Sequence, residues 1–183
     1  MSSENRAGLS TGAAPLLDGS GLRVALACGR FNDRITNGLL AGCRARLTEL
    51  QVDDGDITEH WAPGAFELPL VARHLAETGR VDAVVTLGAV IRGDTPHFEF
   101  VAGECAAGVA RVALDTGVPI VFGVLTTDTV GQAFVRSVDG PGNKGRESAD
   151  TAVEMACLIR GIRGAAGGGG RVGFRGGDGT AQR

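Results

Sequence analysis

Residues 81–97 read VDAVVTLGAVIRGDTPH, and this stretch decides the fold. Its first ten residues, 81–90, are almost continuously Val, Ala and Leu, a pattern typical of a strand that is buried on both faces of a parallel sheet. A polar turn over 92–95 leads into a helix that we expect from 96 to about 115. A buried strand followed closely by a helix is one repeat of an α/β fold.

The same alternation continues in both directions from this stretch. The apolar patterns before it predict strands over 22–28 and 57–61 and helices over 35–50 and 66–77. Those after it predict a buried strand over 118–125 and helices over 130–135 and 147–162. Four strand–helix repeats with right-handed crossovers predict an α/β three-layer sandwich around a central four-stranded, mainly parallel sheet, of the flavodoxin-like type.

The chain of 183 residues suits one domain with a full core. We expect a flexible N-terminal arm over 1–20, a single domain over 21–163 and a glycine-rich disordered tail over 164–183. The tail holds too few apolar residues to offset the entropy of ordering it. Its scattered arginines could contact RNA, but a solvated tail is the simpler interpretation.

Charge and composition exclude several classes of protein. The net charge of −3 gives no reason to expect a nucleic-acid or anionic-membrane partner. No apolar run approaches the roughly 20 residues of a membrane span. The start of the chain has neither the basic nor the apolar region of a signal peptide, so we expect a cytoplasmic protein.

The cysteines give no sign of a metal site or a redox motif. Cys28, Cys43, Cys105 and Cys157 form no Cys-x-x-Cys pair, and no group of Cys and His has the spacing of metal ligands. Each lies among apolar or small residues, which is typical of reduced, buried cysteines in a cytosolic protein. We therefore expect no bound metal.

Ligands of open α/β sheets bind beyond the carboxyl ends of the strands, so the residues after each strand are the first candidates for a site. The loop after the predicted strand 81–90 is the most informative. Thr95 suits a helix N-cap and Pro96 the first helical position, which places His97 in the first turn. Free N–H groups there can hold a phosphate, and the helix dipole favours neutral imidazole over imidazolium.

These residues predict proton transfer by His97 on a phosphorylated substrate, although an ordinary surface histidine is the alternative. The sequence also leaves the roles of other candidate residues undecided. Phe31 could stack on a planar heterocycle or close the core, and Glu67 could serve a ligand or complement a helix dipole. The segment GNKG (142–145) resembles a phosphate loop but lacks the complete Gly-x-x-x-x-Gly-Lys-Ser/Thr pattern.

Taken together, the loops resemble the lumazine synthase family. The resemblance covers roughly residues 20–160, with its motifs in family order and at compatible spacing: GRFN (29–32), PGAFELP (63–69), LGAVIRGDTPHF (87–98), FGVLTT (122–127) and GNKG (142–145). The chain departs from the family pattern after Arg136, where it reads SVDGP over 137–141.

The resemblance implies an enzyme that needs no cofactor. Family members condense 5-amino-6-(D-ribitylamino)uracil with 3,4-dihydroxy-2-butanone 4-phosphate through an imine, eliminate phosphate and close a ring to give 6,7-dimethyl-8-ribityllumazine, the penultimate step of riboflavin biosynthesis. This chemistry depends chiefly on proximity and orientation, with a further contribution from proton transfer.

The resemblance also implies a role for each matching residue. His97 would be the catalytic acid and base. Asp94 and Thr95 would bind the phosphate through their backbone N–H groups, and Arg136 would supply positive charge. The pyrimidine and ribityl groups would be held by Phe31, Ala65, Phe66, Glu67, Ala89, Val90, Ile91 and, from a neighbouring subunit, Phe122.

A site shared with a neighbouring subunit implies a homo-oligomer. The family forms pentamers, many of which assemble into icosahedral cages, and the short segment 137–143 is compatible with a cage. Riboflavin synthase is a candidate partner. Two other functions stay open at this level: a cage-forming structural paralogue, and a flavin- or lumazine-binding protein without turnover.

Overall fold

One parallel sheet forms the centre of the protein. The computed structural model describes residues 17–167, so the expected arm and tail lie largely outside the described residues. The strands β1 (Val24–Gly29), β2 (Ile57–Ala62), β3 (Ala83–Ile91) and β4 (Ile120–Thr127) are arranged in the order β2-β1-β3-β4, and every neighbouring pair is parallel. The stretch that predicted the fold is therefore a central strand.

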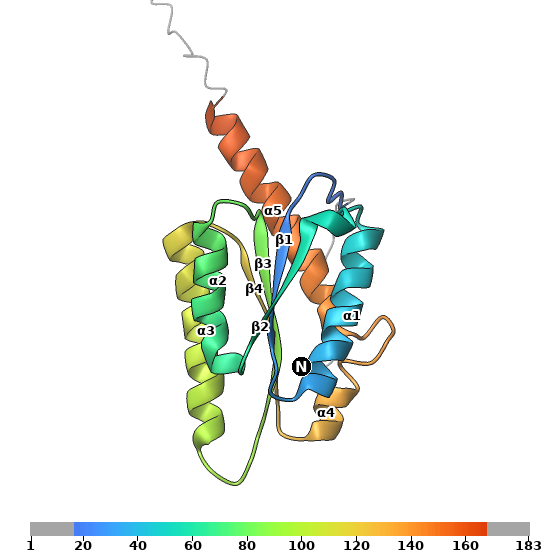
Figure 1. Cartoon of the computed structure of the whole chain (residues 1–183), viewed down its shortest axis with the longest axis vertical. Coiled ribbons are helices and arrows are strands. Elements are labelled where there is room, and N and C mark those ends of the chain that lie inside the picture. The colour runs from blue at the N-terminus through green and yellow to red at the C-terminus, as the bar shows by residue number, and fades with distance from the viewer. Residues whose placement is uncertain (1–16, 168–183) are drawn as a thin grey trace, which may run out of the picture.

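Helices cover both faces of the sheet, as the sequence predicted (Figure 1). The helices are α1 (Asp33–Glu49), α2 (Leu68–Glu77), α3 (His97–Thr116), α4 (Val130–Phe134) and α5 (Lys144–Gly167). Helices α1 and α5 lie on one face, and α2 and α3 lie on the other. The three-layer α/β fold is confirmed.

Each face of the sheet has its own core because side chains alternate along the strands. On β1, Leu26 and Cys28 belong to the core beneath α1 and α5, whereas Ala25 and Ala27 belong to the core beneath α2 and α3. All four are fully buried. Burial on both faces explains why β1 and β3 read as continuous apolar runs and do not alternate.

Strand β4 differs from the expectation of a wholly buried strand. Within residues 17–167 it is an edge strand that pairs only with β3, and Phe122 and Thr126 on it are exposed. An edge strand differs from a central one in lacking a hydrogen-bonded neighbour on one side, and an apolar sequence alone does not reveal that difference. Phe122 is 39% exposed, which is unusual for an apolar side chain within a sheet of a single chain.

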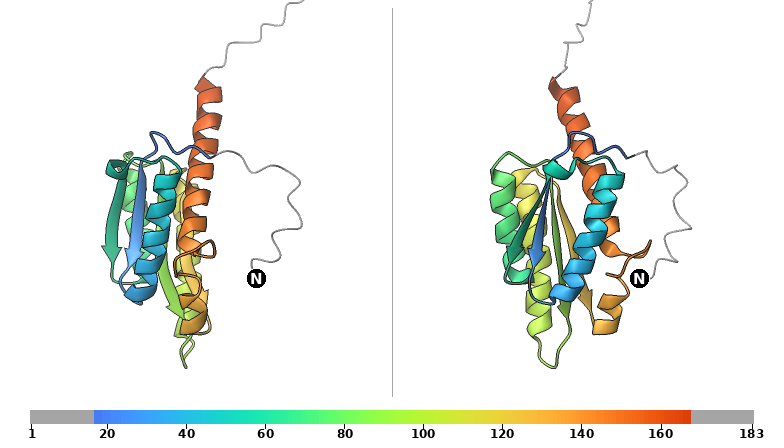
Figure 2. Two further views of the ribbon diagram at one scale, coloured as in Figure 1. Left: turned by 90° about the vertical axis from the view of Figure 1, so that its right-hand side faces the viewer. Right: turned by 45° about the vertical axis from the view of Figure 1, so that its right-hand side comes forward.

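Helix α5 extends well beyond the sheet (Figure 2). It continues to Gly167, so the domain boundary expected at residue 163 lies within the helix.

Of the four cysteines, Cys28, Cys43 and Cys105 are buried and Cys157 is half-buried, and none forms a disulfide. Burial raises the pKa of Cys28 to about 12 and that of Cys105 to about 11, so these thiols stay protonated at neutral pH.

Candidate functional site

The loops after β1 and β2 lie side by side at the carboxyl edge of the sheet. The parallel register pairs Gly29 with Ala62 at the ends of these strands. Beyond it, the N–H of Arg30 donates to the carbonyl of Ala62 (2.9 Å) and the N–H of Phe31 to that of Pro63 (3.1 Å). These bonds place the ring of Phe31 at the loop that carries Phe66 and Glu67.

Two aromatic rings stand in solvent at this edge. Phe31 is 74% exposed and Phe66 is 56% exposed, and Glu67 beside them is also exposed. A phenyl ring left in water at a strand end is available to stack on a planar ligand, since burying it would be favourable. The exposure of Phe31 excludes the alternative that it closes the core of this chain. Ala65, which directly precedes Phe66, is buried, so it can contact a ligand at this edge mainly through its backbone.

Asn32 joins these loops to β3. Its backbone is left-handed (φ 63°), a conformation that asparagine tolerates better than most residues, and it is the N-cap of α1. Its Nδ2 donates to the carbonyl of Ala89 at 2.9 Å. Ala89 and Val90 are buried and Ile91 is half-buried, so this part of β3 presents mostly backbone to a ligand.

The loop after β3 begins α3 one residue later than expected. Pro96 is the N-cap residue, no side-chain hydrogen bond caps the helix, and His97 is the first helical residue. The predicted N-cap role of Thr95 is therefore wrong; the φ of −68° at Pro96 leads directly into the helix. His97 lies in the first turn, as the sequence predicted. Asp94, Thr95 and His97 are all exposed.

Arg92 holds the base of this loop. Its N–H donates to the carbonyl of Thr127 (2.9 Å), and its guanidinium bonds to Asp128 (2.9 Å) and to Glu99. The guanidinium also lies 4.1 Å from the centre of the Phe98 ring. The hydrogen bond from Arg92 lowers the pKa of Glu99, which keeps that carboxylate charged in the first turn of α3.

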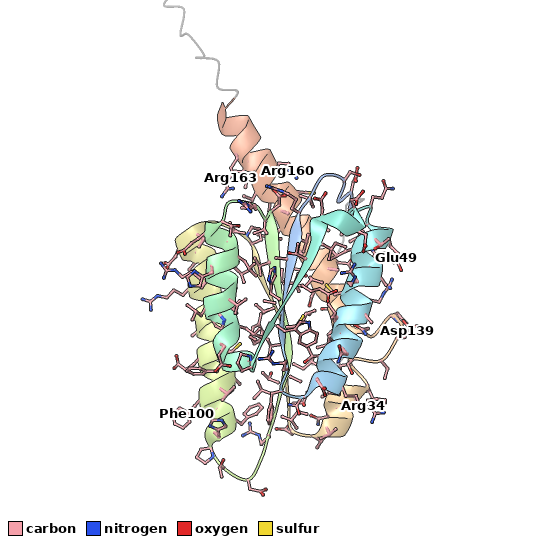
Figure 3. The ribbon with its side chains drawn as sticks, in the orientation of Figure 1. Arg34, Glu49, Phe100, Asp139, Arg160 and Arg163 are labelled. Atoms are coloured by element: carbon pink, nitrogen blue, oxygen red, sulfur yellow. The ribbon has the colours of Figure 1, made fainter. Side chains whose placement is uncertain are left out.

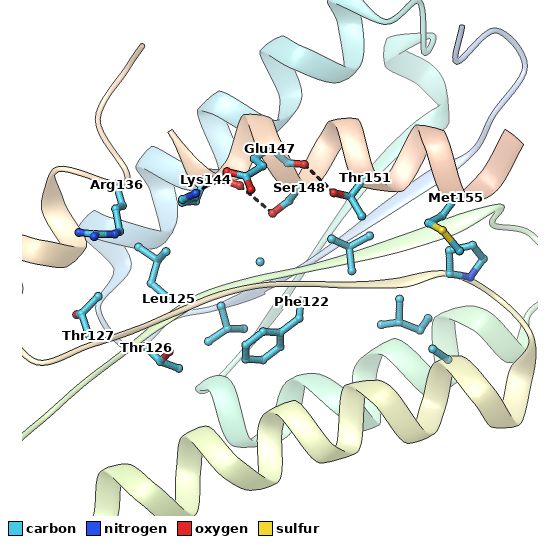
Figure 4. A pocket seen from close by; sticks show the side chains of 16 residues that line it. Phe122, Leu125, Thr126, Thr127, Arg136, Lys144, Glu147, Ser148, Thr151 and Met155 are labelled. Carbon is cyan, nitrogen blue, oxygen red and sulfur yellow. Dashed lines mark hydrogen bonds and ion pairs between the residues drawn. The ribbon is translucent and has the colours of Figure 1, made fainter. Parts of the chain in front are cut away.

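A separate groove of about 550 Å³ runs along β4 beneath the first turns of α5 (Figure 4). Its volume is in the range of small-molecule sites. Phe122, Arg136 and Lys144 line it, with Arg136 and Lys144 toward the end that Thr127 also lines. None of the residues of the three loops at the carboxyl edge lines this groove.

The two cations of the groove are connected through the backbone. The N–H of Lys144 donates to the carbonyl of Arg136 at 2.8 Å, and Nη1 of Arg136 donates to the carbonyl of Gln132 at 2.9 Å. Lys144 Nζ lies 2.5 Å from a carboxylate oxygen of Glu147. Lys144 was not among the predicted site residues, although the GNKG segment that contains it was a signal for anion binding.

The structure thus divides the predicted residues into two groups. The carboxyl-edge group consists of Phe31, Ala65, Phe66, Glu67, Ala89, Val90, Ile91, Asp94, Thr95 and His97; the groove group consists of Phe122 and Arg136, joined by Lys144. The groove group can bind an anion, and the carboxyl-edge group offers exposed rings, a histidine and a helix N-terminus. Neither group alone holds all the functions expected of the site.

Two further findings concern only residues 17–167. There, no three His, Cys, Asp or Glu side chains are clustered so that they could bind a metal ion. No helix in that range has the length and apolar character needed to cross a membrane.

Comparison with known proteins relates the chain to one family. The family model for 6,7-dimethyl-8-ribityllumazine synthase matches residues 21–160. A 6,7-dimethyl-8-ribityllumazine synthase of Edwardsiella ictaluri is 56% identical over 142 residues, which are 77% of this chain and 91% of that protein. A protein of the same name from Thermus thermophilus is 51% identical over 149 residues, which are 81% of this chain and 95% of that protein.

The bond between Asn32 and Ala89 leads to a stability prediction. Asn32→Ala removes the bond and places alanine in a left-handed conformation, which together should lower the free energy of unfolding by about 2–4 kcal/mol. Asn32→Gly removes the same bond without the conformational cost, so it should lose about 1 kcal/mol less. Urea denaturation at one fixed protein concentration measures both. Equal losses would show that the backbone conformation contributes nothing.

Proposed function

The chain belongs to the 6,7-dimethyl-8-ribityllumazine synthase family, and we propose that its active site forms between two copies of the chain. In this proposal it condenses 5-amino-6-(D-ribitylamino)uracil with 3,4-dihydroxy-2-butanone 4-phosphate to 6,7-dimethyl-8-ribityllumazine, phosphate and water. The observation that carries the shared site is the separation of Arg136 and Phe122, in the β4 groove, from His97 and Phe31 at the carboxyl edge.

The carboxyl edge of one copy binds the pyrimidine substrate. The exposed ring of Phe31 stacks on the pyrimidine, whose edge is bonded by the backbone at Ala89, Val90 and Ile91. The segment Ala65–Glu67 holds the ribityl chain, for which the exposed Glu67 carboxylate is a hydrogen-bond acceptor. The Asn32–Ala89 bond fixes the spacing between the stacking ring and the backbone.

The phosphate of the second substrate is bound from both copies. The N–H groups near Asp94 and Thr95, at the uncapped start of α3, supply one half of its site. Arg136 and Lys144 from the neighbouring groove supply the other half as cations. Phe122 of the same groove closes over the bound pyrimidine, which accounts for the exposure of that ring in a single chain.

His97 moves the protons of the reaction. Attack of the substrate amine on the ketone forms an imine with loss of water, elimination then releases phosphate, and ring closure with loss of a second water completes the product. Each step moves a proton, and a first-turn histidine next to the phosphate is placed to accept and return it. The reaction requires no redox cofactor because no electrons are transferred to or from a third component.

A shared site requires an oligomer, which we propose to be a pentamer or an icosahedral cage of pentamers. Apolar side chains exposed near β4 and α5 support an interface there, among them Met155, Leu158 and Ile162. The unpaired thiols suit the reducing cytoplasm. Riboflavin synthase, which would use the product, is the partner that this proposal implies for the assembly.

Replacing His97 tests its catalytic role. His97→Ala should lower kcat by about 10- to 10³-fold, because proton transfer is lost while substrate positioning is retained. His74→Ala is the matched control, since His74 lies on the outer face of α2 with its side chain 73% exposed. Steady-state formation of the fluorescent product measures both variants. Equal turnover in the wild type and His97→Ala would remove His97 from the mechanism.

Replacing Arg136 tests the phosphate site. Arg136→Ala should raise the KM for the phosphorylated ketone by about 10- to 100-fold, because a hydrogen bond to a charged group contributes about 1.5–3 kcal/mol. Arg136→Lys should fall between the wild type and Arg136→Ala, since lysine keeps the charge but not the planar fork. Arg73→Ala, on the surface of α2, is the control. A matching rise in the KM for the pyrimidine would contradict the assignment.

The oligomer can be tested by dilution. Sedimentation velocity should show a pentamer or a larger particle, and turnover per chain should fall as dilution releases monomers, because a monomer holds only half of each site. Discrete rings at high protein concentration would exclude the cage and leave the shared site intact. A monomer with full turnover would contradict both.

A further inference from the structure

Asn143 is a polar residue in a place where polar side chains are rare. It is 2% exposed and is among the largest fully buried side chains of the described chain. It directly precedes α5, which begins at Lys144. A buried amide must have its donors and acceptors satisfied, and the partners of Asn143 show what it holds together.

The oxygen of the Asn143 amide caps α5. Oδ1 accepts from the N–H of Gly145 at 2.8 Å and from that of Arg146 at 3.3 Å, the geometry of a helix N-cap. This half of the side chain could be supplied by any of the usual capping residues. Capping alone would therefore require neither asparagine nor deep burial.

The nitrogen of the same amide reaches across to α1 and to the preceding loop. Nδ2 donates to the carbonyls of Ser137 (2.8 Å), Gly38 (3.0 Å) and Val138 (3.1 Å). Its two hydrogens are shared among these three acceptors. Among the common capping residues, only asparagine carries two donor hydrogens beside its acceptor oxygen, whereas a serine or threonine hydroxyl has one hydrogen and aspartate has none.

Glycines allow this close approach. A Cβ on Gly42 would lie 2.4 Å from Oδ1 of Asn143, and a Cβ on Gly38 would lie 2.4 Å from the carbonyl oxygen of Ser137. A Cβ on Gly145 would lie 1.9 Å from the carbonyl oxygen of Leu39. The amide is thus enclosed by backbone on the α1 side and has little freedom to move.

The loop that Asn143 holds connects the two cations of the groove. Arg136 precedes the loop and Lys144 follows it, and the bond from the N–H of Lys144 to the carbonyl of Arg136 closes its base. The loop itself is exposed at its outer part, where Figure 3 shows Asp139 projecting from the protein. Its sequence is SVDGP over 137–141.

We propose that Asn143 is a positioning residue for phosphate binding: by fixing residues 137 and 138 to α1 and to the start of α5, it sets the separation and direction of Arg136 and Lys144. The proposal rests on the phosphate role of these two cations given above. Asn143 is buried and does not touch the substrate; it acts through the backbone at both ends of the loop.

Asn143→Ser and Asn143→Asp test this role, because each keeps an oxygen that can cap α5 and each lacks the Nδ2 group that donates to three carbonyls. Serine changes no charge, whereas aspartate adds a negative charge near the cations. Both variants should keep the helical content of the wild type in circular dichroism. A matched control is Val153→Ala, which leaves a cavity under α5 away from the loop.

The readouts are the KM of each substrate and inhibition by inorganic phosphate. Both Asn143 variants should raise the KM for the phosphorylated ketone and the inhibition constant of phosphate by about 10-fold or more, because small misplacements of binding groups are costly. The KM for the pyrimidine should change by no more than about 2-fold. In an Arg136→Ala background, Asn143→Ser should add much less to the loss, since both changes affect the same contact.

Three results would overturn the proposal. The first is an unchanged KM for the ketone in both variants, and the second is a common shift of both KM values like that of Val153→Ala. The third is an effect confined to Asn143→Asp, which would indicate charge and not position. If Arg136→Ala itself left phosphate inhibition unchanged, the phosphate site of the proposed function would fail first, and the role of Asn143 with it.

Discussion

The parallel pairing of β3 with β1 on one side and β4 on the other is the constraint on which the rest of the structure depends. It brings the loops after β1, β2 and β3 to one edge of the sheet, where hydrogen bonds from the backbone N–H of Phe31 and from the side-chain amide of Asn32 hold neighbouring segments together. It also makes β4 an edge strand, with no hydrogen-bonded neighbour on its outer side among the described residues. Both halves of the proposed site therefore follow from a single strand order.

The division of the site between copies has a physical explanation. Exposed phenyl rings at Phe31 and Phe122 are unfavourable in water, and each becomes favourable when a planar substrate and a neighbouring copy cover it. The cations near the end of the groove contribute little selectivity in open solvent, because water screens them. Closing the groove against a second copy would lower the local dielectric and strengthen their hold on phosphate.

Much of the fold could be predicted because both-face burial gives β1 and β3 a continuous apolar sequence that few other structures produce. The exposure of Phe122 could not be predicted, because an apolar residue on an edge strand has the same neighbouring sequence as an apolar residue in the core. The N-cap of α3 was assigned to Thr95 from residue preference, but the fixed φ of Pro96 made proline the cap. The role of Asn143 was hidden because its partners on α1 are about a hundred residues distant in sequence.

The shared site is tested most directly by combining two damaged chains. His97→Ala and Arg136→Ala each damage a different half of every site, so each pure oligomer should have strongly reduced turnover when the ketone concentration is near the wild-type KM. When the two are denatured, mixed in equal amounts and assembled together, about a quarter of the interfaces should pair an intact edge with an intact groove. The account predicts that turnover recovers toward a quarter of the wild-type value. Turnover no greater than the mean of the two separate variants would contradict a site formed between copies.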